Sequence, residues 1–451
     1  MILGTKIGRW LCGLAALVCL VTPLGAADRP ANILILSVDT LRTDRLSVYG
    51  YERNTSPNLD RLLNKGVRFT EARTVEPLTA PALASMLISM PPHEHASTRN
   101  GLRARPDIPS LPRVLRRHGY RAAAFVGSWT LRKNLWEMND HFDTYEAVLT
   151  KSRWLGVWTR EAKAEDLNER AFAWLEEHRR EEGQRPYFLW VHYVEPHAPY
   201  ELHEGFLDQI GPAPPEGAKS RSYRYDSEIA YVDDQIGQLL ARMQGAGALD
   251  NTVIVLVSDH GESLGEHDYW GHGRNLKEPN LSIPMGVVYE GRLAPGVESS
   301  PALITDIAPT VVGLVGLEVP EFFQGLDWSP VFAGETASPA DRVTYYETHK
   351  GAVSPHEGAE GLRRKGLIEV GVLQAGQKET YRVKSETREV FDLVSDGAES
   401  NDLVNADSSM SDSLKQWLSQ VRKGLEVSDE LPPPSLSDDD MEALRALGYL
   451  D

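Results

Sequence analysis

Short apolar runs recur along the chain and alternate with longer amphipathic stretches. Four of the runs have the length and apolar character of strands buried on both faces of a parallel sheet: Asn32–Val38, Arg121–Val126, Tyr187–His192 and Thr252–Val257. Helical spacing or helix-start signals occur at Ser56–Leu62, Ser110–His118, Glu165–His178 and Ser227–Met243. This alternation predicts an α/β fold, in which helices cover both faces of a mostly parallel central sheet.

The pattern changes after about residue 336. Four shorter strand-like segments predict a small antiparallel sheet: Val343–Glu347, Leu367–Val372, Thr380–Lys384 and Glu389–Leu393. Pro432–Pro434 predict a stiff linker, and Ser437–Asp440 predict the start of a terminal helix, where the acidic residues suit a helix start better than a metal site. We therefore expect a catalytic domain over residues 28–336 and a C-terminal subdomain with a terminal helix over residues 337–451.

Residues 1–27 have the layout of a secretory signal peptide. Lys6 and Arg9 precede an apolar stretch from Trp10 to Leu24, and small residues follow at Gly25–Ala27. Because the stretch is short for a membrane span, we expect cleavage, with an uncleaved anchor as the alternative. The pattern predicts an exported protein of a bacterial periplasm or exterior, with membrane contact only through an uncleaved signal.

Cysteine use and charge narrow the chemistry of the mature chain. The two cysteines lie within the signal segment, so a cleaved chain has no disulfide and no thiolate metal site. The formal charge of −18 argues against nucleic acid or an anionic membrane as the main partner. Any site for an anionic ligand must therefore be built from local groups. The oligomeric state is left open.

Polar residues stand where strands end and where one helix begins. Asp39 and Asp259 follow two of the predicted strands, His260 follows Asp259, and Thr79 lies where a loop enters a helix. Strand ends meet at one edge of such a sheet, so these groups form a plausible set of ligands for zinc or manganese, with calcium as the alternative. A metal at Thr79 would make its hydroxyl a better nucleophile. Ordinary capping explains the same spacing equally well.

The helix that begins near Thr79 has a second expected role. Pro81 fits the first turn of this helix, where its missing N–H would be unbonded anyway. We expect the N–H groups after Pro81, and the positive end of the helix dipole, to bind an anionic ester.

Several histidines are candidates for proton transfer or substrate binding. His192, His197 and His272 suit protonation of a leaving group, and together with Glu195 they could instead complete a second metal site. His93 and His95 are expected to hold the segment after the Thr79 helix, and His349 and His356 to lie in an exposed loop. Core or lid packing, more than a substrate wall, is expected for the aromatic residues Trp129, Trp136, Tyr145, Trp154 and Trp158.

Longer motifs contain these candidate residues. They are Asp39–Tyr51, Ser56–Phe69, Pro92–His95, His192–Tyr200, Ser258–His267 and the ending Leu444–Leu450. Taken together they resemble the sulfatase branch of the alkaline phosphatase superfamily, over most of residues 30–450. The resemblance implies an alkaline phosphatase-like fold. It also implies that Asp39, Asp259 and His260 are metal ligands, and that Thr79 is the nucleophile.

The chain departs from the sulfatase pattern at the nucleophile and around it. Thr79 stands where sulfatases have the cysteine of Cys-x-Pro-Ser-Arg, which is oxidised to formylglycine, and oxidation of threonine would give a ketone. Leu83 replaces the arginine of that motif, Thr40 replaces a second aspartate, and His272 stands where a lysine is expected. A threonine nucleophile instead resembles the phosphodiesterases and phosphoethanolamine transferases of the superfamily.

These observations predict an exported, metal-dependent hydrolase that cleaves phosphoric mono- or diesters in preference to sulfuric esters. Thr79 attacks the ester, and His197 or His272 protonates the leaving oxygen. The expected substrate is a small-molecule or glycan- or lipid-linked anionic ester. Two alternatives stay open: a phosphotransferase of phosphoethanolamine or phosphoglycerol type, and a catalytically silent binding protein.

Overall fold

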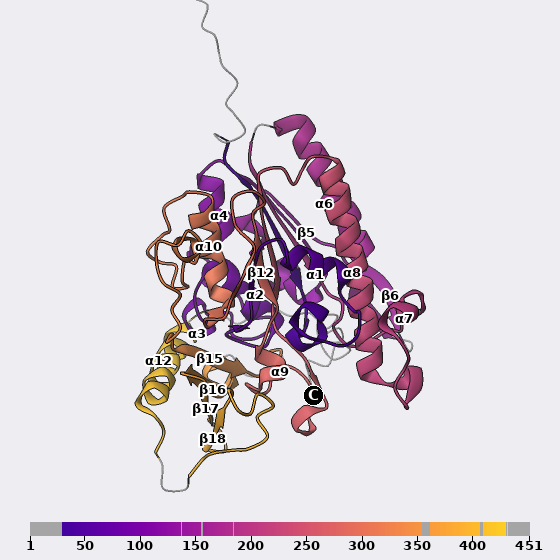
Figure 1. Ribbon diagram of the computed structural model, residues 1–451. Coiled ribbons are helices and arrows are strands. Elements are labelled where there is room, and N and C mark those ends of the chain that lie inside the picture. The colour runs from indigo at the N-terminus through magenta and orange to yellow at the C-terminus, as the bar shows by residue number, and fades with distance from the viewer. Residues whose placement is uncertain are drawn as a thin grey trace, which may run out of the picture. The chain divides into compact units, whose positions relative to one another are not determined.

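An eight-stranded mixed sheet forms the centre of the computed structural model (Figure 1), in the order β13-β2-β12-β9-β1-β8-β4-β5. The structure describes residues 29–136, 138–154, 157–183, 185–353, 361–405, 409–429 and 431. The strands of the sheet are β1 Asn32–Val38, β2 Val67–Phe69, β4 Arg121–Val126, β5 Thr144–Ala147, β8 Tyr187–Tyr193, β9 Thr252–Ser258, β12 Met285–Val288 and β13 Gly296–Glu298.

The middle of the sheet is parallel, as the apolar runs predict. β1 pairs with β8 on one side and β9 on the other, both parallel, and β4 continues the parallel order beyond β8. Only β12 runs against its neighbours β9 and β2. The predicted mostly parallel sheet is therefore confirmed, while the short strands at both edges were not predicted.

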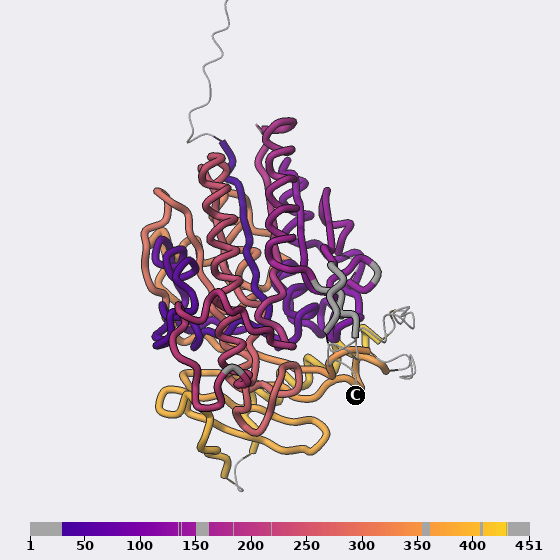
Figure 2. Tube along the Cα trace, turned by 90° about the vertical axis from the view of Figure 1, so that its right-hand side faces the viewer, coloured from indigo at the N-terminus to yellow at the C-terminus, as the bar shows by residue number. Residues whose placement is uncertain are grey.

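Alternate side chains of β1 enter two apolar layers, one on each face of the sheet. Leu34 and Leu36 pack among residues of α1 Pro57–Leu63, α6 Ala164–Glu182 and α8 Arg221–Gly245. Ile33 and Ile35 pack with α2 Thr79–Ile88, α4 Leu111–Arg117 and α10 Ile307–Leu314. Figure 2 shows α6 and α8 running alongside each other over the first of these faces. Burial on both faces explains why β1 is apolar at nearly every position.

A four-stranded antiparallel sheet follows in the C-terminal part of the chain, as predicted. Its strands are β15 Thr344–His349, β16 Leu367–Gln374, β17 Gln377–Arg382 and β18 Thr387–Asp392. Helix α12 Asp412–Ser428 packs on it through Leu414, Trp417 and Val421. The domain boundary near residue 336 stays a prediction.

Shorter elements connect these layers. The remaining helices and strands are α3 Pro92–His95, α5 Lys133–Trp136, α7 Leu207–Ile210, α9 Glu278–Leu281, α11 Ser329–Phe332, β3 Ala72–Arg73, β6 Thr150–Trp154, β7 Val157–Glu161, β10 Ser263–Leu264, β11 Trp270–Gly271 and β14 Ala302–Leu303.

Three predictions concern the ends of the chain. The signal peptide over residues 1–27, the Pro432–Pro434 linker and the terminal helix after Ser437 lie outside the described residues. Among the helices that the structure describes, none has the length and apolar character needed to cross a bilayer.

The tight approach of β2 and β12 gives a test of the sheet packing. A Cβ atom at Gly66 would lie 2.1 Å from the carbonyl oxygen of Val287, a backbone atom that cannot move aside, whereas one at Gly296 would meet nothing within 4 Å. We expect Gly66→Ala to lower the free energy of unfolding by about 1–3 kcal/mol. Urea denaturation would measure it, with Gly296→Ala as the matched control. Equal stability of the two variants would contradict this packing.

Candidate active site

Three buried ligand groups meet where the central parallel strands end. Asp39 follows β1, His192 lies near the end of β8, and Asp259 follows β9. The register pairs Ser37 with His192 and Val38 with Ser258, so the three side chains reach the same edge of the sheet. One ligand atom from each lies within 4.8 Å of the others. This cluster has the spacing of a metal site.

His260 extends the cluster. Its Nε2 lies 3.5 Å from Asp259 Oδ2 and 3.7 Å from Asp39 Oδ1. Its Nδ1 lies 2.9 Å from the carbonyl oxygen of Gly261, which can only accept, so Nδ1 carries the proton. Burial lowers the pKa of His260 well below its usual value, so the ring is neutral. A lone pair on Nε2 thus faces two carboxylates, an arrangement that a bound cation would stabilise.

His192 is held in the same way. Its Nδ1 lies 2.9 Å from Ser37 Oγ, which also accepts a hydrogen bond from Trp190 Nε1 at 2.8 Å. The opposite nitrogen, Nε2, lies 3.7 Å from Asp39 Oδ2. Burial lowers the pKa of His192 to about 3, so this ring is neutral too. Metal-binding histidines commonly use their second nitrogen for such an orienting bond. Neither Ser37 nor Trp190 was predicted from the sequence, where the available signal was a serine inside an apolar strand.

The surroundings of Asp259 also fit a cation. Its Oδ1 accepts hydrogen bonds from the main-chain N–H groups of His260 and Thr40, at 2.8 and 3.2 Å. Its Oδ2 is buried and has no hydrogen-bond partner among the described residues. Burial raises the pKa of Asp259 to about 7, although the two N–H groups and the nearby His272 oppose the shift. Two carboxylates with two imidazoles are a ligand set for zinc or manganese, whereas calcium prefers oxygen ligands alone.

Thr40 explains one departure from the sulfatase pattern. It is fully buried with a φ of 53°, a conformation that is unusual for a β-branched residue. Its N–H bonds to Asp259 and its carbonyl oxygen accepts from the Tyr225 hydroxyl at 2.6 Å. The strained backbone at Thr40 thus directs an N–H group at Asp259, and Thr40 contributes to the site through its main chain.

Thr79 lies at the edge of the cluster. It is the first residue of α2, and its Oγ1 lies 3.3 Å from His260 Nε2. One expectation about this helix is wrong. The N–H of Ala80 bonds to Asn100 Oδ1 at 3.1 Å and that of Ala82 to the Leu78 carbonyl, so neither is available to an ester. The positive end of the helix dipole remains for that role. Leu83, in the arginine position, is buried in the apolar core.

Two further histidines, His272 and His197, lie next to the cluster. The ring centroid of His272 lies 4.4 Å from that of His260 and 5.2 Å from that of His197. His272 Nδ1 donates to Glu262 Oε1 at 3.0 Å. Although burial opposes ionisation of Glu262, His272 outweighs it and the pKa of this carboxyl stays below its usual value. His197 Nδ1 lies 2.6 Å from the Ala198 carbonyl oxygen, and burial, aided by His272, lowers its pKa to about 4. Of the two rings, His272 is the one whose Nδ1 bonds to a carboxylate, an arrangement that supports proton transfer from its other nitrogen.

The other candidate residues with described side chains make contacts that stabilise the fold and do not join the metal-type cluster. Glu195 Oε1 accepts from the Ala164 N–H at the start of α6, and no metal-type grouping among the described residues includes it. His95 Nε2 bonds to Ser85 in α2 at 2.9 Å, as expected for a residue that holds this helix. The prediction that His349 lies in an exposed loop is wrong, because it is fully buried at the end of β15. His356 lies outside the described residues.

Those predicted aromatic side chains that the structure describes pack in the core. Trp129, Trp136 and Tyr145 are buried, and Trp136 Nε1 donates to the Ala80 carbonyl oxygen at 3.2 Å. Trp136 therefore packs against the start of α2 and does not wall an open cleft. The side chains of Trp154 and Trp158 are outside the described part of the chain.

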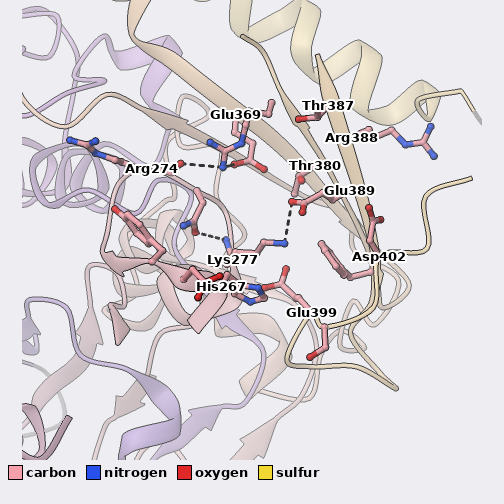
Figure 3. A pocket seen from close by; sticks show the side chains of 16 residues that line it. His267, Arg274, Lys277, Glu369, Thr380, Thr387, Arg388, Glu389, Glu399 and Asp402 are labelled. Carbon is pink, nitrogen blue, oxygen red and sulfur yellow. Dashed lines mark hydrogen bonds and ion pairs between the residues drawn. The ribbon is translucent and has the colours of Figure 1, made fainter. Parts of the chain in front are cut away.

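A separate cavity of about 860 Å³ lies between residues 267–277 and the C-terminal sheet (Figure 3). Its charged side chains pair with one another. Lys277 Nζ lies 3.1 Å from Glu389, and Arg382 lies 3.2 Å from Glu369. Because its cations already face carboxylates, this cavity is a poorer site for an anionic ester than the buried Asp/His cluster.

Known proteins with this architecture are sulfatases and their relatives. Residues 31–317 match the family model described as Sulfatase, and residues 265–424 match that of the C-terminal region of N-sulphoglucosamine sulphohydrolase. An N-acetylglucosamine-6-O-sulfatase of Bacteroides thetaiotaomicron is 24% identical over 71% of this chain and 74% of its own length. A choline-sulfatase of Rhizobium meliloti is 26% identical over 64% of this chain and 68% of its own.

Solved structures agree on the fold. An enzyme bound to its substrate D-glucosamine-2-N,6-O-disulfate superposes with a TM-score of 0.71 at 21% identity, covering 91% of this chain and 100% of that one. A phosphonate monoester hydrolase from Silicibacter pomeroyi gives a TM-score of 0.66 at 18% identity, covering 91% and 98%. Because the Sulfatase family model matches more than half of this chain, the chain belongs to the sulfatase family.

Proposed function

We propose that this sulfatase-family hydrolase is metal-dependent and cleaves an anionic ester through Thr79. Asp39, His192, Asp259 and His260 are the residues that would hold the ion, zinc or manganese. One observation carries the proposal: Thr79 Oγ1 lies 3.3 Å from His260 Nε2, at the edge of a buried carboxylate and imidazole cluster. Assigning His192 to the metal extends the ligand set that the sequence suggested.

The residues around the cluster suit a two-step reaction. A bound divalent ion would supply Lewis acidity and compensate negative charge. Thr79 Oγ1 gives up its proton to solvent and attacks phosphorus or sulfur, the bond to the leaving oxygen breaks, and an ester of Thr79 remains. His272, oriented by Glu262, gives the leaving oxygen a proton. Water then hydrolyses the threonyl ester, which restores the Thr79 hydroxyl and releases the acid.

Two ester classes are candidates. Phosphoric mono- or diesters fit the residues better, because Thr79 cannot become formylglycine and Leu83 and His272 replace an arginine and a lysine of the sulfatase pattern. Sulfuric esters are the second candidate, since most of the named relatives are sulfatases. Several of these names refer to sugars, so we propose a glycan-linked ester as the substrate class. We also propose export through residues 1–27.

Removal of the Thr79 hydroxyl tests the nucleophile. We expect Thr79→Ala to abolish turnover of aryl phosphate, bis-aryl phosphate and aryl sulfate, because no covalent ester can form. Thr79→Ser should keep measurable activity. The assay uses mature protein supplied with zinc, manganese or calcium in turn, with metal content and circular dichroism as controls. Full turnover by a folded Thr79→Ala variant would overturn the mechanism, and turnover of aryl sulfate alone would overturn the phosphoester preference.

A leaving-group series tests His272. We expect His272→Asn to slow esters of weakly acidic alcohols by about 10²–10⁴-fold, and esters of acidic phenols far less, because good leaving groups do not need a proton. His267→Asn changes an exposed histidine on the same loop and is the matched control. If His272→Asn slowed all esters by the same factor, it would not be the proton donor.

Asp259 gives a pH-dependent test of the metal. Its raised pKa in the metal-free protein means that its contribution to stability is fully present below the unfolded pKa, near 4, and is lost as the pH rises through about 7. In chelator at pH 8, Asp259→Asn should therefore be more stable than the unaltered protein, by up to about 4 kcal/mol. With added manganese the order should reverse, because the ligand is missing.

Urea denaturation at pH 5 and pH 8 would measure this, with Asp268→Asn, which alters an exposed carboxylate, as the control. A stability order that is unchanged by manganese would count against the site.

A further inference from the structure

A second group of buried ionisable side chains lies beside the start and the end of α2, apart from the metal cluster. Glu76, His93, Glu347 and His349 are each no more than 2% exposed. Glu76 precedes α2, His93 follows it in α3, and the other two lie at the end of β15. Burial of such groups is unfavourable unless they are paired, and the proposed reaction uses none of them.

The four residues form two carboxylate–histidine pairs. The Glu76 carboxylate accepts hydrogen bonds from the main-chain N–H of His349 at 3.0 Å and from its Nδ1 at 2.9 Å. Glu347 Oε1 accepts from the main-chain N–H and from the Nδ1 of His93, both at 2.9 Å. The pairs approach each other where His349 Nε2 lies 3.8 Å from Glu347 Oε2.

The first pair is joined to the nucleophile by a short, well-bonded segment. The Glu76 carbonyl oxygen accepts from the Leu78 N–H at 2.9 Å and from Thr74 Oγ1 at 3.1 Å. Pro77 fixes one more torsion, and the main-chain N–H of Glu347 bonds to the Val75 carbonyl oxygen at 3.1 Å. A shift of the Glu76 side chain would therefore move the backbone that leads directly into Thr79.

The second pair holds the segment after α2. The His93 ring packs edge-on against Trp417 of α12, with ring centroids 4.9 Å apart. A Cβ atom at Gly424 of the same helix would lie 2.6 Å from His93 Cδ2, so this contact is tight. Strand β15 of the C-terminal sheet thus bonds to the loop before the helix that begins at Thr79, and α12 packs against the segment after that helix.

We propose that Glu76 and His349 are positioning residues for Thr79. Their bond places the first residue of α2 beside the metal cluster, while the Glu347–His93 pair secures the far end of the helix. This inference rests on the proposed function. It gives the C-terminal subdomain a part in the reaction, because β15 supplies the group that holds the nucleophile loop.

Two substitutions of one residue separate the two sides of His349. In His349→Asn the amide nitrogen takes the place of Nδ1 and can still bond to Glu76. In His349→Gln the amide reaches the place of Nε2, towards Glu347, and the side-chain bond to Glu76 is lost while the main-chain bond stays. We expect kcat for an aryl ester to stay within about threefold in His349→Asn and to fall about 10- to 100-fold in His349→Gln. KM and metal content should change little in either variant.

Glu76→Gln and Glu347→Gln form the matched pair of carboxylate variants. Both replace a buried, hydrogen-bonded carboxyl with an amide and both should lower Tm, but only Glu76→Gln should lower kcat at a temperature where both are folded. Glu76→Gln also decides the matter if His349→Gln does not fold. Equal loss of kcat in Glu76→Gln and Glu347→Gln, or kcat in His349→Gln as high as in His349→Asn, would overturn the proposal.

Thr79→Ala is assayed in parallel so that two kinds of failure can be told apart. If turnover does not require Thr79, the proposed function fails. If turnover requires Thr79 but is indifferent to Glu76 and His349, only the positioning role fails.

Discussion

The burial of two neighbouring carboxyl groups, those of Asp39 and Asp259, is the constraint on which the rest of the structure depends. The carboxylates of Asp39 and Asp259 are fully buried at the ends of adjacent strands, and the nearest imidazoles, His192 and His260, are neutral and turn their Nε2 atoms towards them. Such a cluster is unfavourable by itself, because buried carboxylates resist ionisation. A divalent cation turns the same arrangement into a stable one, and it also gives a hydroxyl at its edge the setting of a nucleophile.

Hydrogen bonds between segments that are distant in sequence hold the residues around this cluster in place. Arg42, in the loop after β1, donates to the Glu262 carbonyl oxygen and to the Glu266 carboxylate, in the loop after β9. Ser37 and Trp190 orient His192 from the strands themselves. The C-terminal sheet reaches the loop before Thr79 through His349. His192 and the loops around the cluster are thus held by neighbours outside the proposed ligand set.

Much of this arrangement could be predicted from the sequence, but the contacts between distant segments could not. Asp39, Thr79, Asp259 and His260 were identified because residues at strand and helix ends of an α/β sheet converge, and the structure does bring them together. The role of His192 shifted from proton donor to candidate ligand, because its register opposite Ser37 is a property of the folded sheet. The pairing of Glu76 with His349 spans 273 positions, and no local pattern announces it.

The sequence by itself determined the layered α/β architecture, the antiparallel C-terminal sheet and the identity of the groups that can bind a metal or attack an ester. These follow from periodicity and residue chemistry, which act over a few neighbouring positions. Only the tertiary structure decided which histidines face the two buried aspartates, that the N–H groups of Ala80 and Ala82 are already bonded, and that His349 is buried against Glu76. Those outcomes depend on distances between segments far apart in the chain, and packing sets such distances.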